Sequence, residues 1–161
     1  MAPSQRAATA AGSQSAPVVY AGLQLRIVAF ILDVMVLIAF GMLFAAAVLA
    51  LLVIDADNGN PSDRAFLISG VILGLYVLVF VPLYHILLWS WRGQTVGMMA
   101  VHIKVLSRNG GRVTLGRSAL RLFGYAASVL PLFLGLLMAL FDGKRRTLHD
   151  RLAGTVVVEE L

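Results

Sequence analysis

The chain has 161 residues, of which 60% are hydrophobic and 13% are charged, with a mean hydropathy of +0.89 and a net charge of +5. A soluble domain is typically about 45–50% apolar and about 25% charged, so this composition excludes that class and indicates an integral membrane protein. The basic residues flank apolar segments, where membrane topology and anionic lipid explain them better than nucleic acid does. There is no cysteine, which excludes disulfide bonds and thiol catalysis.

Residues 1–20 are rich in Ala, Ser, Gln and Pro and carry no helical hydrophobic stripe. We therefore expect a disordered N-terminal tail, followed by a single membrane domain over residues 21–161. The tail lacks the apolar core of a secretory signal, so the first apolar segment is predicted to be a retained span.

The first predicted span, about residues 26–54, contains two charged side chains, Arg26 and Asp33. Seven residues bring them back to one helix face, about 10.5 Å apart along the axis, so we expect each to meet a third group. An aspartate inside the bilayer usually faces a bundle interior or a water-filled site. Residues 34–54 are uncharged and can cross about 30 Å without Asp33, so an interfacial position is the alternative.

The second predicted span covers about residues 65–90 and follows an acidic loop with turn dipeptides at residues 58–61. Gly70 and Gly74 form a GxxxG spacing within it, which permits close helix contact. We predict that these two glycines mediate helix packing.

Residues 92–117 carry basic side chains and no acid, which places this segment in the cytoplasm by the positive-inside rule. Apolar and polar residues alternate over 101–105 and again over 112–115, with an Asn-Gly-Gly turn at 109–111. This pattern predicts a small cytoplasmic β-hairpin over about residues 99–115. With two spans, the N-terminus is cytoplasmic as well.

The third apolar stretch, about residues 119–141, is long enough for one crossing, but a crossing places the basic residues 144–151 outside. Pro131 sits near its middle, where a helix is expected to break. We therefore favour a re-entrant helical hairpin over a further span. The β-branched run at about residues 154–160 predicts a C-terminal strand that joins the β-hairpin. The expected fold is an α-helical integral membrane protein with two full transmembrane helices, this Pro-broken hairpin and a small cytoplasmic β-element.

Enzyme signatures are absent from the sequence. The three histidines are scattered, and there is no phosphate-binding loop, nucleophile elbow or zinc spacing. His149 precedes Asp150 at a turn, where capping or orienting a partner suffices. We predict no catalytic residue, no metal site and no cofactor.

Three motifs together resemble the RDD family of bacterial membrane proteins: Arg26 with Asp33 in the first span, GQTVG at residues 93–97, and TLHDRLAGT at residues 147–155. The resemblance extends from about Tyr20 to Val158. The family is named for one arginine and two aspartates, which by position are Arg26, Asp33 and Asp150, with Asp142 the competing choice for the second aspartate. Met98 departs from the Lys or Arg expected after GQTxG.

The resemblance implies a multi-pass protein of the bacterial inner membrane, and the family is associated with transport, including sodium–proton antiport. One hypothesis is therefore transport of a monovalent cation or proton by a homo-oligomer, with the ion bound at Asp33 and its charge tuned by Arg26 and Asp150. The other is a non-catalytic scaffold or accessory subunit, in which these charges form a structural latch. A lipid-handling role is a third. Secondary candidates for the charge network are Asp142, Arg121 and His149.

Overall fold

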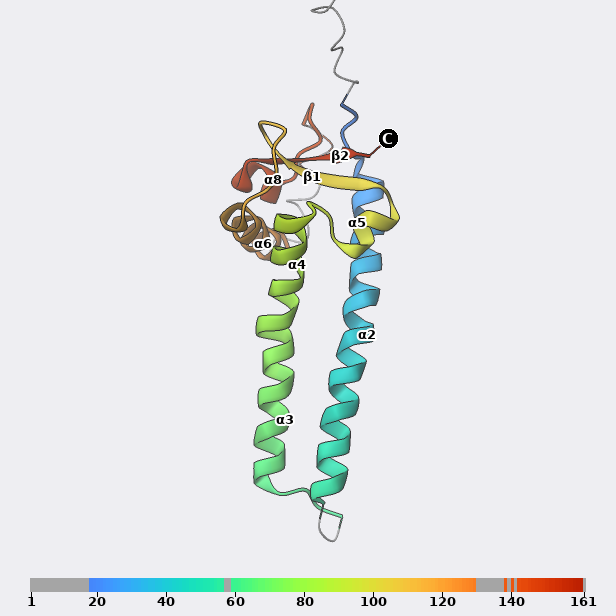
Figure 1. Ribbon diagram of the computed structural model, residues 1–161, viewed down its shortest axis with the longest axis vertical. Coiled ribbons are helices and arrows are strands. Elements are labelled where there is room, and N and C mark those ends of the chain that lie inside the picture. Colours follow the sequence, from blue (N-terminus) through green and yellow to red (C-terminus); the bar gives the residue numbers. More distant parts are fainter. Residues whose placement is uncertain (1–17, 57–58, 130–137, 139, 141, 161) are drawn as a thin grey trace, which may run out of the picture.

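Two long helices lie side by side and carry shorter elements at one end in the computed structural model, which describes residues 18–56, 59–129, 138, 140 and 142–160 (Figure 1). The first is α2, Leu23–Asp55. The second joins α3, Asp63–Leu75, the π-helical turn η1, Tyr76–Phe80, and α4, Val81–Trp91.

Both long helices are apolar enough and long enough to cross a membrane. Their apolar side chains are mostly on the surface; Leu43 is 67% exposed and Leu78 is 76% exposed. Exposed apolar surface on this scale marks contact with another apolar phase, so the helices are membrane-spanning candidates at the positions that the sequence predicts.

Aromatic side chains join the two long helices. Phe44 packs against Tyr76 and Phe80, with ring centroids 4.9 and 5.7 Å apart, and Phe40 packs against Phe80 at 5.3 Å. The Tyr76 hydroxyl donates a hydrogen bond to the Leu37 carbonyl. The π-helical turn η1 ends two residues before Pro82, whose missing N–H interrupts the regular α-helical ladder.

The shorter elements form what we call the cap, meaning α5, β1, α6, α8 and β2. Their bounds are α5 Val96–Ala100, β1 Ile103–Ser107, α6 Leu115–Val129, α8 Leu148–Ala153 and β2 Thr155–Glu159. Strand β1 pairs antiparallel with β2, in register from Ile103 opposite Glu159 to Ser107 opposite Thr155.

The predicted β-hairpin over residues 99–115 is wrong in its second strand. The turn is present, since the Gly110 N–H donates to the Ser107 carbonyl at 2.8 Å, but residues 112–114 form no strand and lead into α6. The partner of β1 is instead β2, whose first four residues are all buried. Pairing β1 with β2 buries apolar side chains on both faces of β2 and so lowers the free energy more than pairing it with residues 112–114, of which only Val113 is buried.

The disordered tail predicted for residues 1–20 extends too far, because Val19 and Tyr20 are ordered. Tyr20 forms a β-bridge with Val158, and the Glu159 N–H donates to the Val19 carbonyl at 2.9 Å. Residues 1–17 lie outside the described residues. Segments from the start, middle and end of the chain therefore meet at one end of the long helices.

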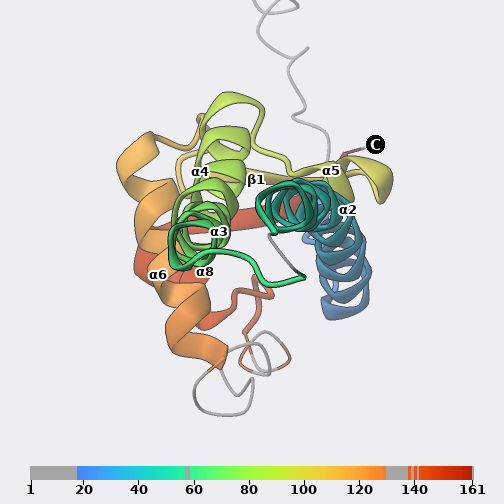
Figure 2. The ribbon, with the colours of Figure 1, turned by 90° about the horizontal axis from the view of Figure 1, so that it is seen from below.

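Helix α6 lies crosswise to the two long helices, as the views along and across them both show (Figures 1 and 2). It exposes Leu120 and Phe123, at 54% and 74%, and buries Arg121. The remainder of the predicted apolar hairpin, residues 130–137, 139 and 141, lies outside the described residues, so the choice between a re-entrant hairpin and a further span stays a prediction.

Candidate functional site

Asp33 lies on α2 in a cluster of neutral hydrogen-bond donors and is 5% exposed. Its Oδ1 accepts from the Tyr84 hydroxyl at 2.6 Å and from the Gly97 N–H at 2.8 Å. Its Oδ2 accepts from the Thr95 hydroxyl at 2.6 Å. The three donors come from α4 and from the start of α5, so Asp33 ties α2 to both elements.

The local sequence GQTVG fits this cluster closely. Thr95 is the N-cap of α5, and its side-chain oxygen accepts from the Met98 N–H at 3.3 Å. At Gly97 a Cβ atom would collide with the Ala29 carbonyl and lie 3.0 Å from the Asp33 carboxyl carbon, so only glycine allows this approach to α2. Gly93 has a φ of +75°, and Gln94 donates to the Ile103 carbonyl at 3.2 Å. The motif thus joins α2 to β1.

Asp150 on α8 lies between two arginines in a second cluster and has no exposed surface. Its Oδ2 accepts from Arg26 Nη1, and its Oδ1 lies 2.7 Å from Arg121 Nη1. Arg26 also donates to the Ala21 carbonyl, and Arg121 donates to the Thr155 hydroxyl at 3.0 Å. This cluster therefore joins α2, α6, α8 and β2.

The sequence TLHDRLAGT builds the Asp150 cluster locally. Thr147 and Asp150 form the capping box of α8, in which the Thr147 N–H donates to Asp150 Oδ2 at 3.2 Å. Gly154 ends the helix in the left-handed conformation with a φ of 62°. Burial opposes ionisation of Asp150, but the charges of Arg121 and Arg26 outweigh it and hold the pKa of Asp150 below its usual value.

His149 belongs to an aromatic stack beside Asp150. Its ring stacks on Tyr125 at 3.9 Å, and Tyr125 stacks on Trp89 at 5.7 Å. The Arg121 guanidinium lies 5.0 Å from the Trp89 ring centroid. Burial lowers the pKa of His149 to about 3, so the ring is neutral at physiological pH.

Asp142, the competing candidate, lies in a separate cluster nearer the surface. Its carboxylate pairs with Arg146 at 2.9 Å and with Arg151 at 2.7 Å. The hydrogen bond from Arg146 is the main reason that the pKa of Asp142 is below its usual value. The structure thus brings Asp150, and not Asp142, to Arg26.

Arg26 and Asp33 do not meet, and each has a partner from elsewhere in the chain. Sequence reasoning missed Tyr84, Thr95 and Gly97 as the donors to Asp33. Two of them stand in the GQTVG motif, which carried the family resemblance without revealing its contact, and nothing in the sequence marked Tyr84. A Cβ atom built at Gly70 or Gly74 meets nothing within 4 Å, and their packing role stays a prediction.

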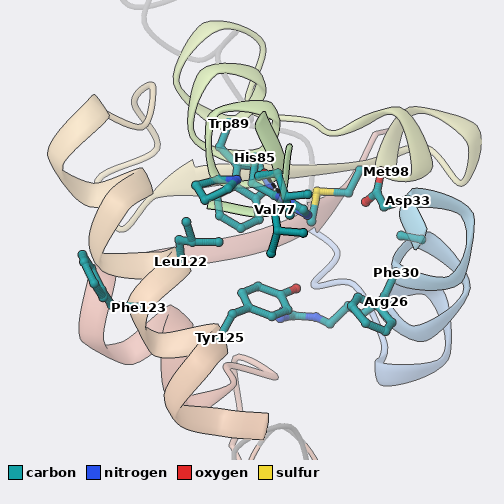
Figure 3. A pocket seen from close by; sticks show the side chains of 13 residues that line it. Arg26, Phe30, Asp33, Val77, His85, Trp89, Met98, Leu122, Phe123 and Tyr125 are labelled. Carbon is teal, nitrogen blue, oxygen red and sulfur yellow. Dashed lines mark hydrogen bonds between the residues drawn. The ribbon is translucent and has the colours of Figure 1, made fainter. Parts of the chain in front are cut away.

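A cavity of about 430 Å³ lies between α2, α4 and α6 (Figure 3). Arg26 and Asp33 both line it, and most of the other lining side chains are apolar or aromatic. In the described part of the chain, His, Asp and Glu side chains nowhere gather in threes as a metal site requires.

The RDD family model matches residues 20–154, which include both clusters except Thr155, and this match confirms the resemblance. The chain is 31% identical over 98 residues to Uncharacterized protein RP437 of Rickettsia prowazekii (strain Madrid E), covering 60% of this chain and 54% of the relative. It is 27% identical over 146 residues to Uncharacterized protein YxaI of Bacillus subtilis (strain 168), covering 86% of this chain and 96% of the relative. The chain therefore spans about half of the first relative and nearly all of the second. No solved structure matches the chain.

Proposed function

The chain belongs to the RDD family of membrane proteins. From this premise we propose that its buried charged residues, Arg26, Asp33, Arg121 and Asp150, form a structural latch. The latch holds the cap against one end of the two membrane helices. The protein is then a non-catalytic membrane scaffold or accessory subunit that presents the cap at the membrane surface.

The position of Asp150 is the observation that carries this proposal. It binds arginines from α2 and α6 while it caps α8, and Arg121 continues the network to Thr155 on β2. A buried ion pair is weak evidence for net stability, but removing one partner is strongly destabilising. Such a pair therefore specifies how segments dock more than it adds to the total stability.

Asp33 supports the latch by the kind of partners it has. Its carboxylate accepts three hydrogen bonds, and all three donors are uncharged: two hydroxyl groups and one backbone N–H. A cation instead needs oxygen atoms that turn their lone pairs toward it. In the observed arrangement both carboxylate oxygens have hydrogen-bond partners without any cation.

Proton-coupled transport of a monovalent cation is the second candidate, and one observation favours it. Asp33 lines the cavity between the helices, where an ion could reach it. Two spans cannot enclose a polar path across a bilayer, so this function requires a homo-oligomer, with Gly70 and Gly74 as the proposed helix contact. The geometry supports the latch better because the Asp33 oxygens are already hydrogen-bonded.

We place the protein in the bacterial inner membrane as a multi-pass protein with both termini and the cap in the cytoplasm. The basic residues of segments 92–117 and 144–151 support this orientation. The pairing of Tyr20 and β1 with β2 supports a common side for these three segments.

Asp33→Asn separates the two functions, with Asp63→Asn as a matched control because Asp63 is exposed at the start of α3. An amide cannot accept hydrogen bonds on both of its ends, so at least one donor loses its acceptor at a cost of about 1–3 kcal/mol. The latch predicts lower thermal stability for Asp33→Asn and no cation-dependent proton flux from wild-type proteoliposomes. Wild-type flux that disappears in Asp33→Asn, with stability unchanged, would establish transport and reject the latch.

A further inference from the structure

The cavity between α2, α4 and α6 has apolar walls and an apolar rim. Its volume of about 430 Å³ lies within the range of small-molecule sites, roughly 300–1,000 Å³. Phe30, Val77 and Phe123 at its edge are 45%, 58% and 74% exposed. These side chains continue the apolar surface of the membrane helices, so the cavity opens toward lipid chains.

Two polar groups of the described residues that line the cavity lack a hydrogen-bond partner, and both are donors. Arg26 Nη2 and Trp89 Nε1 are buried N–H donors that have no hydrogen-bond acceptor among the described residues. Both residues line the cavity, and Arg26 extends from α2 toward Tyr125 on α6 (Figure 3). By contrast, both oxygens of Asp33 already accept hydrogen bonds from other residues. A buried donor without an acceptor is unfavourable, so the cavity selects a ligand that brings acceptor oxygens.

Charge is segregated along α2. Arg26 and Arg121 together face the single carboxylate of Asp150, so these three side chains, of which only Arg26 lines the cavity, carry one excess positive charge. The negative charge of Asp33 lies about 10.5 Å further along the helix and is covered by its own donors. Arg26 lies in the first turn of α2, beside the cap, whereas Val77 lies on η1, at the end of α4 away from the cap and thus deeper along the membrane helices.

We propose that this cavity binds one anionic phospholipid, with its headgroup oxygens at Arg26 and Trp89 and an acyl chain extending past Val77. The orientation matches that of a lipid in the leaflet next to the cap, whose headgroup lies at the helix ends and whose chain points to the bilayer centre. The proposal goes beyond the latch, because it assigns a ligand to the surface that the latch creates.

Tryptophan fluorescence tests this site directly. The chain has two tryptophans, so Trp91→Phe leaves Trp89 as the single reporter. The full-length variant is reconstituted in bilayers of chain-brominated phosphatidylglycerol or of phosphatidylcholine with identical chains. We expect the anionic lipid to quench Trp89 at least twofold more strongly.

Filling the cavity should remove this excess quenching. Val77→Phe blocks the deep end, whereas Val79→Phe makes the same change on the same π-helical turn at a 45% exposed residue that does not line the cavity. Should Val77→Phe fail to fold, the pair Leu122→Phe and Leu120→Phe repeats the comparison on α6, with only Leu122 lining the cavity. Equal quenching by the two lipids overturns the anionic assignment, and equal quenching in the filled and control variants overturns the site.

Discussion

Asp150→Asn is the sharpest perturbation of the latch, because asparagine keeps the shape of aspartate but removes its charge and replaces one acceptor oxygen by an N–H donor. Asp150 is fully buried between Arg26 and Arg121, whose side chains are 5% and 1% exposed. The change leaves two buried guanidinium groups without a counter-ion, and breaking a buried pair in this way costs about 3–5 kcal/mol. At about 2–4 °C per kcal/mol for a chain of this size, the melting temperature should fall by roughly 6–20 °C.

The assay is thermal unfolding of the purified protein in mild detergent. Asp142→Asn is the matched control, because Asp142 also pairs with two arginines, but these are 20% and 43% exposed, so water screens the pairs and their loss should cost less than that of the fully buried pairs. Adding Arg121→Gln to Asp150→Asn removes one uncompensated charge and should restore part of the loss. Melting temperatures of the two asparagine variants within about 2 °C of each other would refute this reasoning.

Three further predictions follow from the same structure. Gly97→Ala should lower the melting temperature, because its Cβ collides with the Ala29 carbonyl. Gly111→Ala, whose Cβ meets nothing within 4 Å, should leave it unchanged. Equal effects of the two substitutions would show that the close approach of Gly97 to α2 does not contribute to stability. Because burial lowers the pKa of His149 to about 3, the unfolded chain binds a proton that the folded chain does not, and stability should fall as the pH drops from about 6.5 to 4.5, by up to about 1.4 kcal/mol per pH unit. Chemical denaturation at each pH checks this, and His149→Asn should flatten the slope. Single cysteines placed in this cysteine-free chain should be labelled from the outside at Asn58 and from the cytoplasm at Arg108 and Glu160; outside labelling of Glu160 would reverse the orientation.

Patterns local in the sequence predicted local features correctly. The two apolar runs correspond to α2 and to the helix from α3 to α4, and the β-branched run near the C-terminus corresponds to β2. The seven-residue spacing of Arg26 and Asp33 implied that they need separate partners, since a straight helix holds them about 10.5 Å apart. This separation follows from the dimensions of an α-helix alone.

Contacts between distant segments could not be read from the sequence. The donors to Asp33 stand 51, 62 and 64 residues further along the chain, beyond the reach of any helical or strand period. The turn at residues 109–111 was correctly located, yet it leads from β1 into α6, because the burial of β2 on both faces decides which strand β1 pairs with. The choice between Asp142 and Asp150 likewise depends on tertiary structure, since both have arginines nearby in sequence.

Hydrogen–deuterium exchange in Arg26→Gln tests the central claim, that the latch holds the cap on the membrane helices. Arg26 is the only residue of α2 that the described structure pairs with Asp150, so its loss should release α8 and β2. The account predicts at least about tenfold faster exchange of the β2 amides, with residues 65–75 of α3 unchanged, and wild-type exchange in the exposed control Arg151→Gln. Wild-type protection of β2 in Arg26→Gln would contradict the latch.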